Sequence, residues 1–452
     1  MKRRLNIILA MVLGVIAVKA QSPISVTVDA KKRGYAIDPH FCGVSIFTRG
    51  QVRDHRGMKG FLFSNENKEL VTLFRNAGIR HVRLGATGSA RSETANLTHD
   101  EIDALFAFAK ATDVKVIFSL HAADAGETAK YVWDHYRPWL DYFAFDNEPD
   151  GRAQQFFEDW RTVVRNVTNA VPNAKFAGPD AAGRALALKF VEQVKDTGRL
   201  KLVTQHTYIG GNSRKKGIDV PRGVDLMLSR EWPKASYPAL YQQVCHPVLK
   251  EGLGYRLTEL DDFVHGVTNA SDSFSAALWA LDCMHWWAKH GATGVNFQNS
   301  QWLPTDTFYI DANRQYQMHP KAYGLRAFEV GSHGWTESVA MENPLELNVT
   351  TYAVGDETNC CVTIINKEHG ANAGKATVTI AANGFQAKRA DAMVLKAANV
   401  TVMSMKDATL GGSNISNDKE WRGKWKKVRI SDGKCVVDVE PASAVIVRLG
   451  AK

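Results

Sequence analysis

The sequence is poor in the features that mark several common classes of protein. Its six cysteines are spread over 452 residues, and it contains no CxxC or HExxH motif. Such sparse cysteines exclude a small disulfide scaffold, and the missing motifs leave no local signature of a metal site. The chain also has no internal repeat or low-complexity linker, and 45% of its residues are hydrophobic and 10% aromatic. This composition excludes an intrinsically disordered or collagen-like protein.

Long runs of one charge are also missing. The formal net charge is +9, and it falls by four to +5 when Lys2, Arg3, Arg4 and Lys19 are discounted with the N-terminal segment. The densest basic patch that remains, at residues 214–216, is interpreted as a solvated loop. We therefore expect no nucleic-acid partner, whereas the mild positive charge is compatible with an anionic substrate.

The first twenty residues form a separate unit. A basic start at residues 2–4 is followed by an apolar run from Ile7 to Val18, and then by small residues up to Ala20. This order predicts a cleaved signal peptide over residues 1–20 and export to the periplasm or the medium, and its compact basic head favours a bacterial source. No cysteine directly follows the run, and no later run reaches the roughly 18 apolar residues of a membrane span. We therefore expect neither a lipid anchor nor membrane insertion.

The cysteines are expected to be mostly buried free thiols. An oxidising compartment would permit a disulfide between Cys435 and Cys360 or Cys361, but the spacing of the cysteines does not decide whether it forms.

From residue 39 to residue 330 the chain repeats one pattern of an apolar run, a polar loop and a segment with helical periodicity. This alternation predicts βα units. Eight units in this length favour an α/β fold of the (β/α)8 barrel type, because no glycine fingerprint of a dinucleotide-binding sheet follows the first strand. The eight strands are expected at residues 41–47, 79–84, 114–120, 142–146, 175–178, 202–206, 255–259 and 294–298.

After about residue 330 the pattern changes to alternating strands without a long helix, which predicts a β-sandwich over residues 331–452. A strand-like run at 24–28, within the segment 21–38, is expected to join this sandwich. The helix after the seventh barrel strand is expected to begin after Ser273 and to end at Gly291, with Trp286 and Trp287 packed against the barrel. The sandwich strands are expected at residues 346–352, 361–366, 375–381, 400–405, 427–430, 435–439 and 444–449.

Two glutamates stand where a barrel enzyme places its catalytic groups, at the C-terminal ends of strands. Glu148 follows the fourth strand in Asn147-Glu148-Pro149, and Glu259 ends the seventh. The proline directly after Glu148 restricts the backbone there. Strands four and seven face each other across the barrel mouth, so the two carboxylates would flank a glycosidic bond and act as acid/base and nucleophile.

These motifs resemble the retaining (β/α)8 glycoside hydrolases, and in particular glycoside hydrolase family 79, the β-glucuronidase and heparanase-like family. The Asn-Glu-Pro motif indicates only the larger clan, whereas the stretch from the seventh to the eighth strand is more specific to the family. The stretches that carry the resemblance are residues 82–85, 147–149, 205–208, 259–262, 266–267, 271–282 and 290–297.

The resemblance implies Glu148 as general acid/base and Glu259 as nucleophile. Asn147 would then bind the 2-hydroxyl of the sugar, and Arg83 would support Glu259, which stays ionised while Glu148 stays protonated in a less polar pocket. It also implies that the subsite for a uronic acid is lined by two residues of the sixth strand, His206 and Tyr208.

A glucuronidase must also bind the carboxylate at C6 of the sugar. The candidates are Tyr208, Gln298, Tyr309 and the backbone near Gly266. The sequence departs from the family after strand eight, at residues 299–306, and after strand two, where 85–88 lack the paired glycines.

Two further features lie where a substrate could reach them. The insert 210–221 contains Arg214, Lys215 and Lys216, which would either contact a polyanionic leaving group or remain a solvated loop. Trp302 would stack on a sugar ring, or pack in a core or at a domain interface.

These features together predict a retaining exo-β-glucuronidase that removes terminal glucuronic acid, including a 4-O-methylated form, from oligo- or polysaccharides. The alternatives are an endo-acting heparanase-like enzyme, a β-xylosidase or β-glucosidase of the same clan, and a carbohydrate-binding protein without activity. No cofactor or metal is expected, because protonation and carboxylate attack need none.

Overall fold

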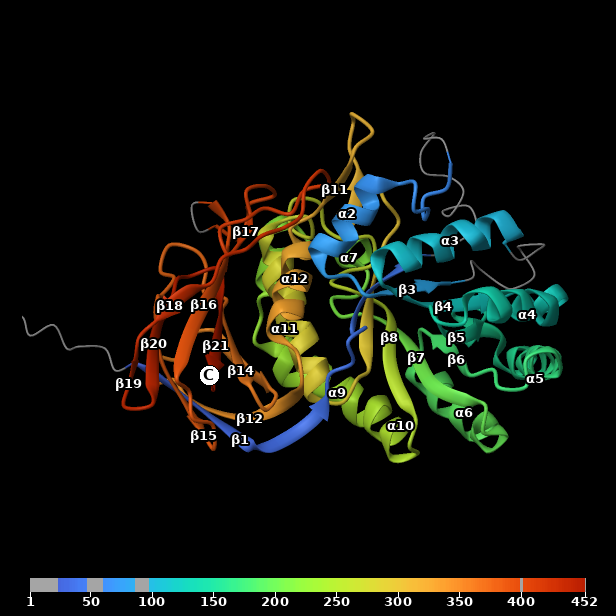
Figure 1. Ribbon diagram of the computed structural model, residues 1–452, viewed down its shortest axis with the longest axis horizontal. Coiled ribbons are helices and arrows are strands. Elements are labelled where there is room, and N and C mark those ends of the chain that lie inside the picture. Colours follow the sequence, from blue (N-terminus) through green and yellow to red (C-terminus); the bar gives the residue numbers. More distant parts are fainter. Residues whose placement is uncertain (1–22, 47–59, 86–96, 399–400, 452) are drawn as a thin grey trace, which may run out of the picture.

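The computed structural model describes residues 23–46, 60–85, 97–398 and 401–451. It contains a (β/α)8 barrel and a β-rich domain, with two long helices between them (Figure 1). The predicted signal peptide at 1–20 lies outside the described residues. Within the described part of the chain, no helix is long and apolar enough to cross a membrane.

The barrel consists of eight parallel strands, β2 to β9, and it closes because β2 pairs with both β3 and β9. This confirms the predicted fold class. The observed strands lie close to the predicted ones: β2 (Cys42–Ile46), β3 (His81–Leu84), β4 (Lys115–Leu120), β5 (Leu140–Phe145), β6 (Phe176–Ala181), β7 (Leu200–Tyr208), β8 (Gly254–Asp261) and β9 (Gly294–Gln298).

The N-terminal end of the barrel is closed by a buried cation. The Arg256 guanidinium donates to Asn296 Oδ1 at 2.7 Å and to the carbonyls of His40 and Phe41 at 2.9 and 3.1 Å. A Cβ at Gly294 would lie 2.1 Å from this guanidinium, so a larger residue there would displace it. The floor of the barrel is therefore a fixed polar plug, which leaves the opposite end for a substrate.

Helices surround the barrel between successive strands. Their ends follow local sequence: Thr98 and Glu101 form a capping box at the start of α3, and Gly78 ends α2 at a φ of 70°. The helices are α2 (Lys68–Ala77), α3 (His99–Thr112), α4 (Ala125–Tyr136), α5 (Ala153–Ala170), α6 (Arg184–Val194), α7 (Ser213–Lys216), α8 (Val220–Met227), α9 (Tyr237–Leu240), α10 (His246–Lys250), α11 (Phe274–Lys289) and α12 (Lys321–Gly331).

The second domain is one sheet of eleven strands that curls into a β-sandwich. As predicted, the N-terminal strand joins it: β1 pairs antiparallel with β12 and parallel with β15. Its strands are β1 (Ile24–Ala36), β12 (Trp335–Glu342), β13 (Val349–Gly355), β14 (Asn359–Asn366), β15 (Ala376–Asn383), β16 (Arg389–Lys396), β17 (Thr409–Leu410), β18 (Lys426–Val428), β19 (Ile430–Ser431), β20 (Lys434–Val439) and β21 (Ser443–Gly450). A separate hairpin, β10 (Phe308–Ile310) with β11 (Tyr316–Met318), follows β9.

Two predictions about this domain are wrong. The strand expected at 400–405 does not form over its described residues 401–405, where 402–403 make a turn and 405 a bend. Strands β12 and β16 were not predicted. Both strands alternate between buried and more exposed residues only in part. β16 is held in the sheet by β21 along one edge and by β17 and β18 along the other.

The two domains meet through α11 and α12 (Figure 1). Every residue of α11 from Phe274 to Ala288 is buried, including Trp286 and Trp287, which confirms that these tryptophans serve packing. At the interface, the buried Lys367 ammonium lies 2.7 Å from Asp282 Oδ2. The hydroxyls of Thr350 and Tyr352 donate to Asp282 Oδ1 at 2.7 and 2.8 Å.

The six cysteines are free thiols, and all except Cys361 are buried. No disulfide joins Cys435 to Cys360 or Cys361. Burial raises the pKa of Cys435 to about 11, so this thiol has little reactive thiolate at neutral pH.

Candidate active site

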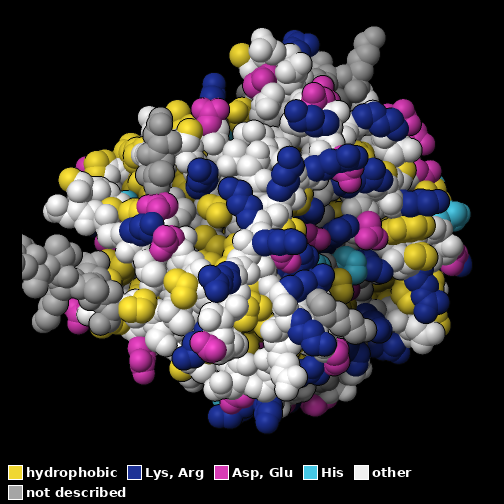
Figure 2. Space-filling model, turned by 60° about the vertical axis from the view of Figure 1, so that its left-hand side comes forward, with side chains coloured by type: hydrophobic (Ala, Val, Ile, Leu, Met, Phe, Trp, Pro, Cys, Tyr) yellow, Lys and Arg dark blue, Asp and Glu magenta, His cyan; other side chains and the backbone are white. Residues whose placement is uncertain are grey.

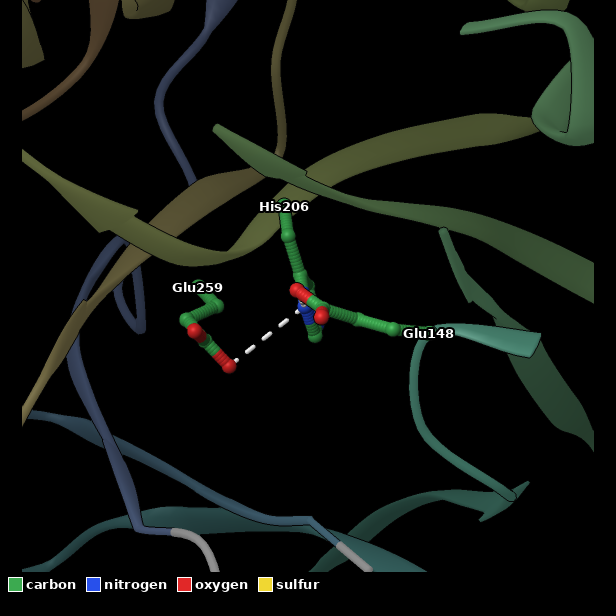
Figure 3. A group of neighbouring side chains, drawn as sticks. All are labelled: Glu148, His206 and Glu259. Carbon is green, nitrogen blue, oxygen red and sulfur yellow. Dashed lines mark hydrogen bonds and ion pairs between the residues drawn. The ribbon is translucent and has the colours of Figure 1, made fainter. Parts of the chain in front are cut away.

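The two predicted catalytic glutamates meet at the C-terminal mouth of the barrel. Glu148 follows β5 and Glu259 lies in β8, and the imidazole of His206 on β7 contacts both. His206 Nδ1 lies 3.0 Å from Glu148 Oε1 and 3.4 Å from Glu259 Oε2. One oxygen of each carboxylate and one nitrogen of His206 all lie within 4.8 Å of one another. Figure 3 shows the three side chains converging on one point.

The backbone around Glu148 has an uncommon conformation. Asp146, Glu148 and Asp180 have φ values of 75°, 45° and 53°, a region that non-glycine residues seldom adopt. The Glu148 N–H donates to the Asp180 carbonyl at 3.0 Å, and Pro149 opens a 3-10 turn directly after it. These contacts offset the backbone strain and place the Glu148 side chain, which is 40% exposed, at the barrel mouth.

Glu259 is almost completely buried, at 2% exposure. The Tyr208 hydroxyl donates a short hydrogen bond to its Oε1, and Arg83 Nη1 lies 3.5 Å from its Oε2. Burial first, and then the negative charge of Glu259, raise the pKa of Tyr208 far above its usual range, so the phenol remains a hydrogen-bond donor. Glu259 is thus a fixed carboxylate supported by a guanidinium and a phenol.

Asp180, which the sequence reasoning missed, lies behind the two glutamates. Its Oδ2 accepts hydrogen bonds from Arg83 Nη2 at 2.7 Å and Nε at 3.2 Å, and its Oδ1 accepts one from the Thr258 hydroxyl at 2.5 Å. His206 Nε2 lies 3.7 Å from Oδ1. The rule that catalytic groups end barrel strands applies to Asp180 as well, since it lies at the end of β6, but the predicted strand stopped at residue 178.

Arg83 connects this group to the sugar-binding candidate Asn147. Its Nη2 donates to Asn147 Oδ1 at 2.8 Å, and its Nη1 donates to the Ser45 hydroxyl at 3.2 Å. The Asn147 N–H is held by Asp146 Oδ1 at 2.7 Å, and Arg152 forms a short ion pair with the same oxygen. The Asn147 amide NH2 is therefore oriented by contacts on its oxygen and on its backbone.

The protonation of the site differs from the prediction. A hydrogen bond from His206 lowers the pKa of Glu148, which outweighs the opposing effect of burial. Burial lowers the pKa of His206, but the carboxylates of Glu259, Asp180 and Glu148 raise it to about 9. The expectation of a protonated Glu148 in a less polar pocket is therefore wrong for the free site, where the proton is held on His206.

Three carboxylate-binding candidates have other contacts. The Gly266 N–H donates to the Phe263 carbonyl at 3.0 Å, so it has no free donor for a substrate. Tyr309 lies in the hairpin β10–β11 and stacks on His319, with ring centroids 4.2 Å apart. Gln298, at the end of β9, is buried and donates to the Ser300 hydroxyl at 2.9 Å.

Gln298 lies closer to the site than the other two candidates. It pairs in register with Ser45 on β2, and the Ser45 hydroxyl accepts from Arg83. Of the carboxylate-binding candidates, Tyr208 and Gln298 thus lie at the barrel mouth beside the two glutamates.

Two further predicted features flank the barrel mouth. The basic insert forms α7, which is tied to the loop after β8 by a bridge between Asn212 and Val264, and Lys216 Nζ donates to the Gly210 carbonyl at 2.8 Å. Trp302 is 57% exposed, which excludes the alternative that it packs in a core. Its loop is fixed by Asp306, whose carboxylate accepts the N–H of Ser300 and Leu303 at 2.7 and 2.8 Å.

Glu148, His206 and Glu259 could also supply three ligand atoms to a metal ion. A metal ion there would have to displace the proton of His206, whose pKa is raised to about 9.

The fold and the site together define a (β/α)8 barrel with a β-sandwich and two facing carboxylates at its mouth. No family model matches the chain, and no curated protein matches it in sequence. Solved structures do share its architecture.

A family 51 α-L-arabinofuranosidase from Bifidobacterium longum has a TM-score of 0.69 at 12% identity, covering 95% of this chain and all of that one. A 4-O-α-L-rhamnosyl-β-D-glucuronidase from Fusarium oxysporum has a TM-score of 0.69 at 14% identity, covering 94% of this chain and all of that one. A monomeric β-xylosidase from Caulobacter crescentus has a TM-score of 0.61 at 14% identity, covering 94% of this chain and 99% of that one. At such identities the likeness establishes a shared fold.

Proposed function

We propose that the protein is a retaining glycoside hydrolase with Glu259 as nucleophile and Glu148 as general acid/base. The observation that carries this proposal is the approach of the two carboxylates, which have oxygens within 4.8 Å of each other. Retaining glycosidases hold their carboxyl groups about 5–5.5 Å apart, whereas inverting enzymes need about 6.5–9.5 Å to admit a water molecule. The similar structures, which are named as glycosidases, support the same reaction class.

The site contains the groups that a double displacement needs. Glu259 attacks the anomeric carbon and forms a glycosyl ester, while Glu148 delivers a proton to the leaving oxygen. In the free site His206 holds that proton, and its Nδ1 lies 3.0 Å from Glu148 Oε1, so the proton can pass to Glu148 without crossing solvent. Glu148 then removes a proton from the incoming water, and Glu259 leaves as a carboxylate supported by Arg83 and Tyr208.

For the substrate, we propose terminal β-glucuronic acid on an oligo- or polysaccharide. The resemblance to family 79 supports this choice, and one structure of the same fold is named a glucuronidase. Tyr208 and Gln298 offer a hydroxyl and an amide at the mouth, and α7 brings three basic residues to the loop that follows β7.

The test is hydrolysis of aryl glycosides by the wild type, Glu148→Gln and Glu259→Gln. The panel comprises the β-glucuronide, β-glucoside, β-xyloside and α-L-arabinofuranoside. Cleavage of the glucuronide alone, with loss in both variants, supports the full proposal. Cleavage of a neutral glycoside instead would support the mechanism and reject glucuronic acid as the substrate. Activity that survives in both variants would reject the mechanism. NMR of the first-formed sugar distinguishes retention from inversion.

A catalytically inactive binding protein and an endo-acting enzyme are tested by the same preparation. Binding of a glucuronic-acid oligosaccharide without cleavage at any bond would favour the first. Release of internal fragments rather than single sugars would favour the second.

We also propose that residues 1–20 are removed on export. Mass spectrometry of the protein from a bacterial periplasm or medium should give a chain that begins at Gln21. Recovery of the full chain from the cytoplasm would reject this.

A further inference from the structure

A groove on the β-sandwich gathers positive charge away from the barrel mouth. It has a volume of about 450 Å³ and is lined by Lys396, Lys424, Lys426, Gly411, Gly412 and Ser413, together with two small apolar residues of β16. We call it the lysine groove. It lies in the domain that α11 and α12 separate from the barrel strands (Figure 1).

The groove forms where one edge of β16 is shared by two short strands. β17 pairs with the end of β16 at Leu395 and Lys396, and β18 pairs with its start at Ala390 to Ala392. Between them the Gly411 N–H donates to the Val394 carbonyl at 2.9 Å, and the Lys424 N–H donates to the Gly411 carbonyl at 2.9 Å. The floor of the groove is thus fixed by backbone hydrogen bonds.

The three lysines of the groove are exposed, and among the described residues none of them forms an ion pair. No acidic residue lines the groove. The segment from 419 to 434 carries seven Lys or Arg residues and only two acidic ones, so the surrounding surface has the same sign. Figure 2 shows many Lys and Arg side chains on the face that this view brings forward, with fewer Asp and Glu side chains between them. Unpaired positive charges in a concave surface concentrate anions there.

A second basic groove provides a comparison. It lies at the N-terminal ends of β5 to β7, has a similar volume of about 440 Å³, and contains Arg137, Lys175, Arg199 and Lys201. There Asp141 supplies a negative charge among the cations, Arg137 stacks on Trp133, and Arg199 donates to the Pro172 carbonyl at 2.5 Å. Part of its charge is already engaged, whereas no ion pair with a described residue engages the three lysines of the lysine groove.

We propose that the lysine groove binds a segment of an acidic polysaccharide through its carboxylates. The class of occupant rests on the proposed function, because a polymer that carries uronic acids at the active site also presents carboxylates elsewhere along its length. A single-stranded nucleic acid fits less well, since no aromatic side chain lines the groove for base stacking. Two sites on one polymer raise its local concentration at the barrel mouth without a new contact there.

The test measures binding of polygalacturonate to the wild-type chain, with dextran and a DNA duplex as probes for comparison. The groove variant is Lys396→Gln/Lys424→Gln/Lys426→Gln, and the matched control Lys175→Gln/Arg199→Gln/Lys201→Gln removes the same charge from the second groove. We expect the Kd for polygalacturonate to rise about tenfold in the groove variant and to change less than about twofold in the control. Binding should weaken with salt, and dextran should not bind.

Three results would each overturn the proposal. They are an equal loss of polygalacturonate affinity in the two variants, no binding of polygalacturonate by the wild type, and tighter binding of a DNA duplex than of polygalacturonate with the same number of negative charges. Equal melting temperatures of the variants show that folding does not cause the difference. Hydrolysis of a small aryl glycoside, which cannot reach the groove, should be unchanged in the groove variant. If the protein binds polygalacturonate in the groove but cleaves no glycoside, the proposed function is rejected and the proposal for the lysine groove stands.

Discussion

Arg83 and Asp180 form a fully buried ion pair in which Nη2 and Nε of the guanidinium donate to one carboxylate oxygen at 2.7 and 3.2 Å. Burial alone would raise the pKa of Asp180, but Arg83 and then His206 hold it well below its usual range. Asp180 is therefore ionised throughout the physiological pH range. Its charge orients Arg83 toward Glu259 and helps to keep His206 protonated, so it acts on the reaction through these neighbours.

Replacing Asp180 with Asn keeps the shape and removes this charge. We expect kcat/KM to fall by about 10²-fold or more, because Arg83 loses its partner and the His206 pKa drops. A pH–rate profile distinguishes this role from a merely structural one, since its alkaline limb should move to lower pH. Thr258→Val, which removes one hydrogen bond to Asp180 and no charge, is the control. An unchanged profile in Asp180→Asn would contradict the assignment.

The stability of the protein should depend on pH through His206. Its pKa is raised from 6.5 to about 9 in the folded chain, so its contribution is fully present below pH 6.5 and is lost as the pH rises through 9. The shift corresponds to at most about 3 kcal/mol. Urea unfolding between pH 6 and pH 10 should show a fall in the free energy of unfolding that is reduced in His206→Gln. Parallel pH curves for both proteins would contradict this.

The pH dependence of Glu148 has the opposite sign. Its pKa is lowered by His206, so the stabilising contact is present above the normal glutamate range and is lost as the pH falls through the folded-state pKa. Carbon-13 NMR of the Glu148 carboxyl should show a lower pKa in the wild type than in His206→Gln. An equal pKa in both would show that the hydrogen bond does not form in solution.

Tyr208→Phe removes the hydroxyl that donates to Glu259 and leaves the ring in place. Hydrogen bonds to charged groups contribute about 1.5–3 kcal/mol, so kcat/KM should fall roughly ten- to hundredfold. Steady-state kinetics on an activated aryl glycoside measures the loss. Tyr309→Phe, in the hairpin, is the matched control and should retain wild-type rates. If Tyr309→Phe loses as much activity as Tyr208→Phe, the conclusion that Tyr208 and not Tyr309 belongs to the active site is wrong.

The contact between the domains should depend on Lys367. Lys367→Met leaves the charge of Asp282 buried without its cation, which costs about 3–5 kcal/mol of stability. Asp282→Asn combined with Lys367→Met should recover part of this loss, because no unpaired charge remains. Lys375→Met, which removes the exposed ion pairs with Asp438 and Glu440, should leave the stability nearly unchanged. Thermal melting of the wild type and the three variants measures these differences in stability, with Lys367→Met expected to be the least stable.

Local patterns were sufficient to predict much of the fold and two central residues of the site. Strand and helix periods repeat within a few residues, so the alternation of 39–330 predicted a barrel, and β9 was predicted at its observed bounds. Glu148 and Glu259 were found because a residue at the end of a barrel strand must face the mouth. The departures lie where pairing is nonlocal: β16 is a strand because β21 and two short strands pair with it, and its own sequence alternates weakly.

The tertiary structure alone decided how charge is distributed. Asp180 lies 32 residues after Glu148 in the chain. The pairing of β6 with β7 and the closure of the barrel bring it into contact with His206 of β7 and Arg83 of β3. Its position determines which group holds the proton, a property that depends on distances between charges in a buried space and not on residue type. The lysine groove also depends on tertiary structure, since strand pairing along β16 brings Lys396 close to Lys424 and Lys426. The sequence by itself determined which chemical groups are available, and packing decided which of them meet, because side chains far apart in the chain interact only after the barrel and the sandwich have closed.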